Sequence, residues 1–383
     1  MMNGRIGESA NRRFLQGALS DSVRPRPLAV SPTRPLVLLF ATCCVFFTAS
    51  ARAADSTTEP IPPQVQSAVD RGLEWLAAHQ DPRTGAWLFG FEGEGPVAAS
   101  TSLSAMAFMA RGHVPGQGPY GENINHAIDC ILNLQAPNGL LAHSVFDRPM
   151  YEHGISTVML CEAYGMLDDK RQKRAAAAIS KAVALILAAQ AIPKDPDDQG
   201  GWRYHPDARD SDTSVTGWQL MALRGAANIG APLPQRAIRD GIAYIKRRAV
   251  DTDTGGFAYT GQSGSDAALA GTGILALELL GKHREPESIR AADYLRRNPI
   301  TEVGNGFYYY TVYYCAQAAW QLGGDYWTDI NGPIRRSLLM KQQADGSWPV
   351  RGTNESMAGT AYGTSMAILA LTVPYRYLPI YQR

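Results

Sequence analysis

The stretch RGLEWLAAHQDPRTGAW, residues 71–87, decides the fold of this chain. It joins a helix-forming run to a Gly-x-Trp turn, with Gln80 between the two. A unit of this kind returns with a period of roughly 40 to 60 residues. Its later copies are Gln135 with Gly139, Gln190 with Gly200-Gly201-Trp202, Gly255-Gly256-Phe257, Gly306-Phe307, and Gln342 with Gly346-Ser347-Trp348. Six turns predict six helix pairs.

The helices on the two sides of each turn differ in composition. Those that follow a turn are rich in small and apolar residues, which predicts burial on every side. Their predicted ranges are 100–111, 151–164, 212–224, 266–280, 308–322 and 360–371. Those that precede a turn, such as 66–79, 236–248 and 332–343, carry charges on one face. We therefore predict an all-α fold, an α/α toroid of six helix hairpins in which inner helices run parallel. Three glycines are predicted to end inner helices: Gly165, Gly225 and Gly281.

The first 54 residues differ from the rest of the chain. An arginine-rich beginning is followed by an apolar run from Leu36 to Phe47 and by an Ala-Arg-Ala step. These features predict a signal peptide cleaved near Ala53 or Ala54, and hence an exported protein, periplasmic or extracellular. An uncleaved anchor is less favoured because the run is shorter than the ~20 residues of a membrane span. The choice between Sec and twin-arginine export stays open. Residues 55–383 are predicted to form a single toroid.

Charge and cysteine content narrow the classes of partner. The chain has 36 Lys and Arg against 35 Asp and Glu, and seven of the arginines but only two of the acids lie in residues 1–54. The remainder is mildly acidic, which does not favour nucleic acid or an anionic membrane surface. Cys130, Cys161 and Cys315 are too widely spaced for a zinc pattern and leave room for at most one disulfide.

The repeat resembles the QW motif of the terpenoid cyclase and protein prenyltransferase superfamily, over residues 60–383. The first copy matches it at Arg71, Gly72, Trp75, Leu76, Gln80, Gly85 and Trp87, and the last copy at Gln343, Gly346 and Trp348. The resemblance implies that glutamine binds backbone groups at helix ends and that tryptophan packs between repeats. It identifies a fold and not an activity.

The resemblance also implies a candidate proton donor. Squalene-hopene-type class II cyclases carry Asp-x-Asp-Asp at the start of a helix on the central cavity, and Asp210-Ser211-Asp212-Thr213 stands in the matching place. Asp212 would protonate an alkene or epoxide, which requires a pKa raised by burial or by Asp210. Taken alone, the residues favour an N-cap at Asp212, which would lower its pKa. Thr213 breaks the motif, and the chain has room for one toroid where squalene cyclases have two.

Glu152 and His153 open the second inner helix as Asp210 and Asp212 open the third. A carboxylate beside an imidazole is suited to general acid–base chemistry, including glycoside hydrolysis. A carboxylate placed at a helix start by the macrodipole is the simpler interpretation. No metal ligand set and no cofactor are expected, since the Asp-x-Cys pair of the prenyltransferase zinc site does not occur in the inner helices.

Aromatic residues at the starts of inner helices are candidate ligand-binding residues. They are Trp218, Tyr309, Tyr310, Tyr313 and Tyr362. A wall of such rings would suit an isoprenoid chain or stabilise a cation, although core packing explains them equally well.

Three functions are compatible with these patterns. The first is a toroid that binds an apolar, isoprenoid-like molecule or another protein at its central mouth, without a defined activity. The second is a terpenoid cyclase-like isomerase with Asp212 as proton donor. The third is a carbohydrate-active toroid that uses Glu152, His153 and Asp212.

Overall fold

Outer and inner helices alternate along the part of the chain that the structure describes. In the computed structural model these residues are 61–87, 98–143, 147–249, 255–261, 263–300, 306–350 and 355–382. The predicted signal peptide lies outside them. They belong to one compact unit, residues 57–383, and this unit alone is considered below.

Twelve α-helices occur in the described ranges, together with four single 3-10 turns. The outer helices are α1 (Pro63–Ala78), α3 (Gly121–Leu134), α5 (Asp169–Ala191), α7 (Gln235–Arg247), α9 (Pro286–Arg297) and α11 (Gly324–Lys341). The inner helices are α2 (Ala98–Ala110), α4 (Pro149–Ala163), α6 (Thr213–Asn228), α8 (Ala267–Leu279), α10 (Tyr308–Leu322) and α12 (Gly359–Leu371). The 3-10 turns are η1 (Tyr164–Met166), η2 (Ser356–Ala358), η3 (Val373–Tyr375) and η4 (Pro379–Tyr381).

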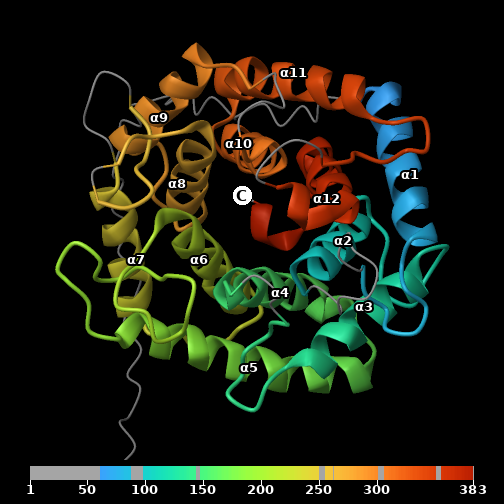
Figure 1. Cartoon of the computed structure of the whole chain (residues 1–383), viewed down its shortest axis with the longest axis horizontal. Helices are drawn as coiled ribbons and strands as arrows, with labels where there is room; N and C mark the ends of the chain where they lie inside the picture. The colour runs from blue at the N-terminus through green and yellow to red at the C-terminus, as the bar shows by residue number, and fades with distance from the viewer. Residues whose placement is uncertain are drawn as a thin grey trace, which may run out of the picture. The chain divides into compact units, whose positions relative to one another are not determined.

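The inner helices form a closed ring inside the outer ones (Figure 1). Each contacts the next, from α2 through α4, α6, α8, α10 and α12 back to α2. Strands are missing from the described ranges, where three isolated β-bridges are the sole extended pairings. The predicted all-α toroid of six helix hairpins is confirmed.

Neighbouring inner helices run parallel, as predicted. The hydroxyl of Ser102 in α2 donates to Ser156 in α4, and Ser104 pairs with Ser365 in α12, both at 2.9 Å. Small residues allow this close approach of helix to helix.

Two of the predicted helix ends are corrected. Gly281, at φ 76°, follows α8 as expected. Gly225 lies inside α6, where a Cβ would stand 3.1 Å from Cys161 Cβ, so its small size serves packing. Gly165 falls within η1 and not at the end of α4.

The Gln-Gly-Trp units are joints between successive repeats. In the four joints that carry a glutamine, its Nε2 donates both to the carbonyl of the turn glycine and to a carbonyl of the next outer helix. Gln190, for example, donates to Gly200 and to Ala237 in α7, at 2.9 Å each. Gln80 and Gln135 make the same pair of bonds to α3 and α5.

The sixth joint closes the ring. Gln342 Nε2 donates to Gly346 at 2.9 Å and to Ala68 of α1 at 2.7 Å. The family resemblance assigned this role to Gln343, and that assignment is wrong, because Gln343 Nε2 donates to Lys341 of its own helix. The last repeat therefore holds the first by the same bonds that join the others.

The turn tryptophans are buried at these joints, as predicted. Trp87, Trp202 and Trp348 expose 1% or less of their surface. Their indole N–H groups donate to carbonyls near the end of the preceding outer helix, at 2.8 Å in every case.

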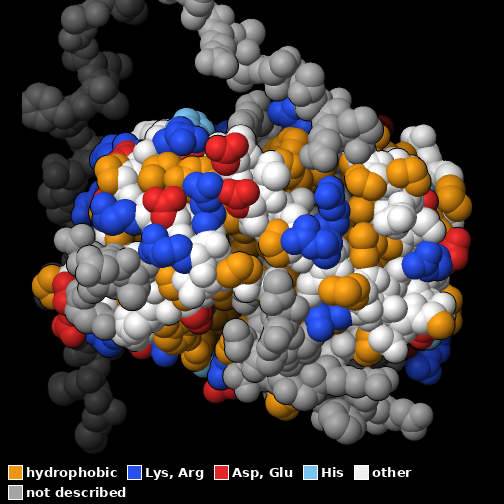
Figure 2. Space-filling view, turned by 90° about the horizontal axis from the view of Figure 1, so that it is seen from above, with side chains coloured by type: hydrophobic (Ala, Val, Ile, Leu, Met, Phe, Trp, Pro, Cys, Tyr) orange, Lys and Arg blue, Asp and Glu red, His pale blue; other side chains and the backbone are white. Residues whose placement is uncertain are grey.

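The outer helices present a mixed surface. Figure 2 shows one side of the wall, where basic, acidic and hydrophobic side chains are interspersed. Arg296 of α9 pairs there with Asp329 of α11 at 2.5 Å. Within the described ranges, α5 is long and apolar enough to cross a membrane by length and composition alone. It lies in the outer ring, with its buried face on α4 and α6.

Candidate functional site

The inner helices all begin at one opening of the ring, which we call the amino-terminal mouth. Asp212 caps α6 at this opening. Its Oδ1 accepts the N–H of Val215 at 2.8 Å and the hydroxyl of Ser214 at 2.7 Å. The side chain of Asp212 is fully buried. The N-cap expected from the sequence is therefore present.

Arg203 lies between the two aspartates of the motif. Its Nη1 contacts Asp212 Oδ2 at 3.1 Å and its Nε contacts Asp210 Oδ2 at 3.2 Å. The side chain of Asp210 is 58% exposed, so the two carboxyls differ sharply in environment. One guanidinium thus joins a buried acid to an acid at the rim of the mouth.

The pKa of Asp212 is raised. Burial is the largest cause, and the N–H of Val215, the hydroxyl of Ser214 and the guanidinium of Arg203 act against it. The expectation that capping would lower this pKa is wrong, since desolvation outweighs the hydrogen bonds. Asp210, which we expected to supply a like charge, is instead held by Arg203 on the other side.

A chain of hydroxyls leads from Asp212 toward the axis. Ser214 donates to Asp212 Oδ1, so the 2.5 Å contact between Ser214 Oγ and Tyr151 Oη is one in which tyrosine donates. Burial and the charge of Asp212 raise the pKa of Tyr151 well above its usual value, which keeps the phenol protonated. The lone pairs of Tyr151 Oη can then accept a hydrogen bond from a ligand hydroxyl.

Two further tyrosines surround Arg203. Its guanidinium lies 4.3 Å from the ring centre of Tyr204 and 5.3 Å from that of Tyr259. Nη1 also donates to Tyr259 Oη at 3.1 Å, and the hydroxyls of Tyr204 and Tyr259 are hydrogen-bonded to each other. Arg148 lies 4.7 Å from the ring of Tyr204. Cation–π contacts of this kind fix the arginine in the wall of the mouth.

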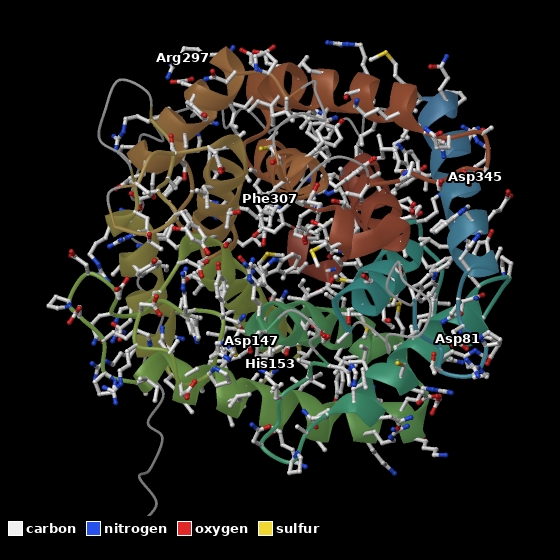
Figure 3. All side chains as sticks on the ribbon, in the orientation of Figure 1. Asp81, Asp147, His153, Arg297, Phe307 and Asp345 are labelled. Atoms are coloured by element: carbon white, nitrogen blue, oxygen red, sulfur yellow. The ribbon has the colours of Figure 1, made fainter. Side chains whose placement is uncertain are left out.

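Glu152 and His153 are directed into the wall and away from this network. Glu152 is buried, and its Oε2 accepts the N–H of Ala98 at 3.2 Å and of His143 at 3.1 Å. His153 lies between α4 and α5 (Figure 3). Its Nδ1 accepts the N–H of Leu141 at 3.0 Å, so Nε2 donates to Ala182 of α5 at 3.2 Å.

The environment of His153 keeps it neutral. Burial lowers the pKa of His153 to about 4. Both ring nitrogens bind backbone groups, so the imidazole links α4 to its neighbours. The structure does not bring Glu152 and His153 together with Asp210 and Asp212.

Several of the candidate aromatic residues form a stack along the ring axis, which we call the aromatic column: Tyr310, Tyr314, Trp218 and Tyr313. Tyr310 and Tyr314 have ring centres 4.7 Å apart. Trp218 lies edge-on to Tyr314 at 5.5 Å and parallel to Tyr313 at 5.7 Å. Within the described ranges the buried indole N–H of Trp218 has no hydrogen-bond partner.

The other two candidates contact the wall of the mouth. Tyr362 donates to Glu355 Oε1 at 2.8 Å. Glu355 is buried and also accepts the N–H groups of Tyr309 and Tyr310, so it caps α10 from the neighbouring repeat. Tyr309 donates to the carbonyl of Pro349 at 3.3 Å, which places it in the wall between α10 and the last turn.

The sequence analysis missed Arg203 and Glu355. Arg203 directly follows the turn tryptophan, so a signal for it was present: a basic residue at the point where the joint opens onto the mouth. Glu355 carried no signal as a cap, because the N–H groups that it caps are 45 and 46 residues away in the chain.

Two small cavities are lined by described residues. One of about 20 Å³ lies beside α1, with Val65 and Trp327 in its lining. Another, of about 10 Å³, lies beside Gln317 and Tyr381. Cavities of this size hold about one water molecule at most. Within the column, the rings pack against one another.

Comparison with known proteins supports the fold. No family model matches the chain, and no curated protein sequence is similar to it. Among solved structures, the GH76A alpha-1,6-mannanase from Salegentibacter sp. HEL1_6 superposes with a TM-score of 0.61 at 12% identity, covering 83% of this chain and 100% of that one. The type II terpene cyclase MstE from Scytonema superposes with a TM-score of 0.53 at 12% identity, covering 82% and 99%. A protein from Actinoplanes gives 0.52 at 17% identity, covering 80% and 98%. The resemblance to terpenoid cyclases thus holds at the level of fold, and the same fold occurs in glycosidases.

Proposed function

We propose that this protein binds a neutral, hydroxyl-rich ligand, the end of a carbohydrate chain, at its amino-terminal mouth. The observation that carries the proposal is the directed chain from Tyr151 through Ser214 to Asp212, which leaves the Tyr151 oxygen free to accept from a ligand hydroxyl. The half-buried rings of Tyr151, Tyr204 and Tyr259 add amphipathic faces of the kind found in small-molecule sites.

The charge distribution favours a neutral ligand over an anion. The guanidinium of Arg203 is already neutralised by two carboxylates, and Tyr151 and Tyr259 keep their protons. An isoprenoid chain would need an apolar cavity, whereas the rings of the column pack against one another. The mannanases among the similar structures bind sugars at the same fold, which is consistent with this choice.

Binding is proposed in preference to hydrolysis. Asp212 is fully buried, and its two oxygens are held by Val215, Ser214 and Arg203. A general acid must come within hydrogen-bond reach of the leaving oxygen. In the proposed site the hydroxyl of Tyr151 contacts the ligand, and Asp212 behind it orients the relay.

The test is a titration with alpha-1,6-mannotriose, cellotriose and maltotriose, followed by calorimetry. Tyr151→Phe removes one oxygen and should weaken binding of the preferred sugar at least tenfold, which corresponds to about 1.4 kcal/mol. Tyr164→Phe, at the opposite end of α4, is the matched control and should bind like the wild type. Absence of binding to all three sugars at millimolar concentration, or equal affinities of wild type and Tyr151→Phe, would contradict the proposal.

A second candidate is a terpenoid cyclase-like isomerase, and one observation favours it. Asp212 is a buried carboxyl with a raised pKa, and its charge is felt by Tyr310 at the top of the column. A protein with this activity would convert squalene to cyclic products, and Asp212→Asn would abolish them.

Export of the chain, which residues 1–54 predict, forms part of the carbohydrate proposal. It would place the amino-terminal mouth among extracellular polysaccharides.

A further inference from the structure

The segment that follows α12 lies against the carboxyl ends of the inner helices. After α12, residues 373–382 turn back through η3 and η4 toward the axis, and the C-terminus is marked at the centre of the ring in Figure 1. Leu378, Ile380 and Tyr381 are each at least 95% buried. They lie among the carboxyl ends of the inner helices, and thus at the opening opposite the amino-terminal mouth.

Three hydrogen bonds from the ring hold this segment. Glu162, in the last turn of α4, accepts the N–H of Ile380 at 3.1 Å. Gln321, in the last turn of α10, donates to the carbonyl of Tyr381 at 2.9 Å. The hydroxyl of Tyr381 is hydrogen-bonded to that of Tyr313. A cavity of about 10 Å³ lies between the segment and residues of α2, α10 and α12.

Tyr313 connects the segment to the mouth. Its ring lies parallel to Trp218, at an interplanar angle of 8°, and Trp218 in turn contacts Tyr314. Tyr314 contacts Tyr310, in the first turn of α10. The aromatic column therefore runs without a break from the hydroxyl of Tyr381 to the mouth, where Tyr310 senses the charge of Asp212.

We propose that residues 378–382 act as a plug whose presence fixes the aromatic column, and that the plug thereby sets ligand affinity at the amino-terminal mouth. The effect on ligand affinity rests on the proposed function, whereas the effect on the aromatic column does not. Packed rings transmit a displacement because a close-packed interior has no free volume to absorb it. With the plug out, Tyr313 loses its hydroxyl partner and the column gains space at its lower end.

The segment has the properties of an element that can leave without unfolding the ring. Apart from the single turns η3 and η4 it has no helical hydrogen-bond ladder, and Tyr377 is 53% exposed. Arg376 adopts the left-handed conformation, at φ 60°. Three hydrogen bonds and three buried side chains hold the segment, without a backbone ladder to the ring, so we expect it to open at lower free energy than the inner helices.

The experiment compares the full chain with a truncation after Tyr377 and with Tyr381→Phe. Gln382→Ala is the control, because Gln382 binds the carbonyl of Arg376 within the segment itself. The first readout is acrylamide quenching of Trp218 fluorescence, isolated by subtracting the signal of the Trp218→Phe version of each variant. The second readout is the Kd for alpha-1,6-mannotriose.

Truncation should raise Trp218 quenching at least twofold and change the Kd at least fivefold, with the helical circular dichroism retained. Tyr381→Phe should move both readouts in the same direction by a smaller amount, and Gln382→Ala should move neither. Unchanged Trp218 quenching in the truncated chain overturns the plug. If the truncated chain does not fold, Tyr381→Phe decides by the same criterion. If the full chain binds no sugar, the function proposed for the mouth fails while the quenching result still decides the plug.

Discussion

Glycine at a turn of this ring has two roles: it adopts a left-handed backbone, and it leaves room for a neighbouring helix. Gly200 and Gly230 allow the two roles to be tested separately. Gly200 lies at a joint with φ 88°, and a Cβ built on it would stand 2.2 Å from the carbonyl oxygen of Asp240 in α7. Gly230 has nearly the same φ, 87°, and no atom within 4 Å of its would-be Cβ. Gly230→Ala therefore imposes backbone strain alone, whereas Gly200→Ala imposes the same strain and a steric clash with α7.

The expected losses follow from these two terms. The left-handed backbone costs an alanine roughly 1–2 kcal/mol at either position. At Gly200 the backbone of α7 must also move away, and overpacking of this kind costs roughly 1–3 kcal/mol. The shift would also strain the bonds of Gln190, which spans Gly200 and Ala237. We expect Gly200→Ala to exceed Gly230→Ala by about 1–3 kcal/mol in lost free energy of unfolding.

Urea denaturation followed by far-ultraviolet circular dichroism measures the difference, provided that the two variants share one m-value. Amide hydrogen exchange locates it: Gly200→Ala should speed exchange in α7, and Gly230→Ala should not. Equal losses for the two alanines would refute the close packing of turn on helix that we assign to the joints.

Three further predictions concern the joints and the buried carboxyls. Trp348→Ala should lower the free energy of unfolding by about 3–5 kcal/mol, because the indole is fully buried at the ring-closing joint. Trp327→Ala, at a half-buried position on the outer surface, should lower it by less than about 2 kcal/mol in the same denaturation assay. Burial raises the pKa of Glu162 to about 8 from 4.5, so the folded chain holds a proton that the unfolded chain releases. The stability from this group is full below about pH 4.5 and falls by about 1.4 kcal/mol per pH unit up to about pH 8; melting curves of Glu162→Gln should lack this slope. Arg203→Gln leaves Asp212 buried without its cation and should lower the free energy of unfolding by about 3 kcal/mol at pH 7. The loss should shrink toward pH 4 as Asp212 takes up a proton. A loss that does not depend on pH would contradict the pairing of Arg203 with Asp212.

The fold could be predicted because its joints are local in sequence. Gln80, Gly85 and Trp87 lie within eight residues of one another, and the bonds they make are set by helix ends and a tight turn. Composition then separated inner from outer helices, since burial on all sides tolerates few charges. The choice between Gln342 and Gln343 failed because both fit the pattern. The orientation of the helix end, fixed only by contact with α1, decides which side chain reaches Ala68.

The site could be predicted only in part, because its geometry arises between repeats. Asp212 was found as a helix start, and its cap is a local feature. Its raised pKa is not, since it depends on how completely the neighbouring repeats exclude water. For His153, the neighbouring residues in the sequence suggested acid–base chemistry. In the structure, its Nε2 donates to the carbonyl of Ala182 in the next outer helix, and this contact determines its tautomer.

The two ends of the ring axis differ in how a charge on a buried carboxyl is stabilised. Of the buried carboxyls, Asp212 lies at the mouth and Glu162 at the plug, and burial raises the pKa of both. Asp212 has Arg203 at 3.1 Å, a cation that favours the ionised form, whereas the N–H of Ile380 is the group that lowers the pKa of Glu162. If the proposed plug opens, water can stabilise a charge at Glu162, whereas Arg203 stabilises a charge at Asp212 in the closed structure. It follows that a rise in pH through 8 acts on the plug end of the column and leaves the Arg203–Asp212 pair intact. Mannotriose affinity that changes through pH 8 in the full chain but not in Glu162→Gln would trace that coupling through the column.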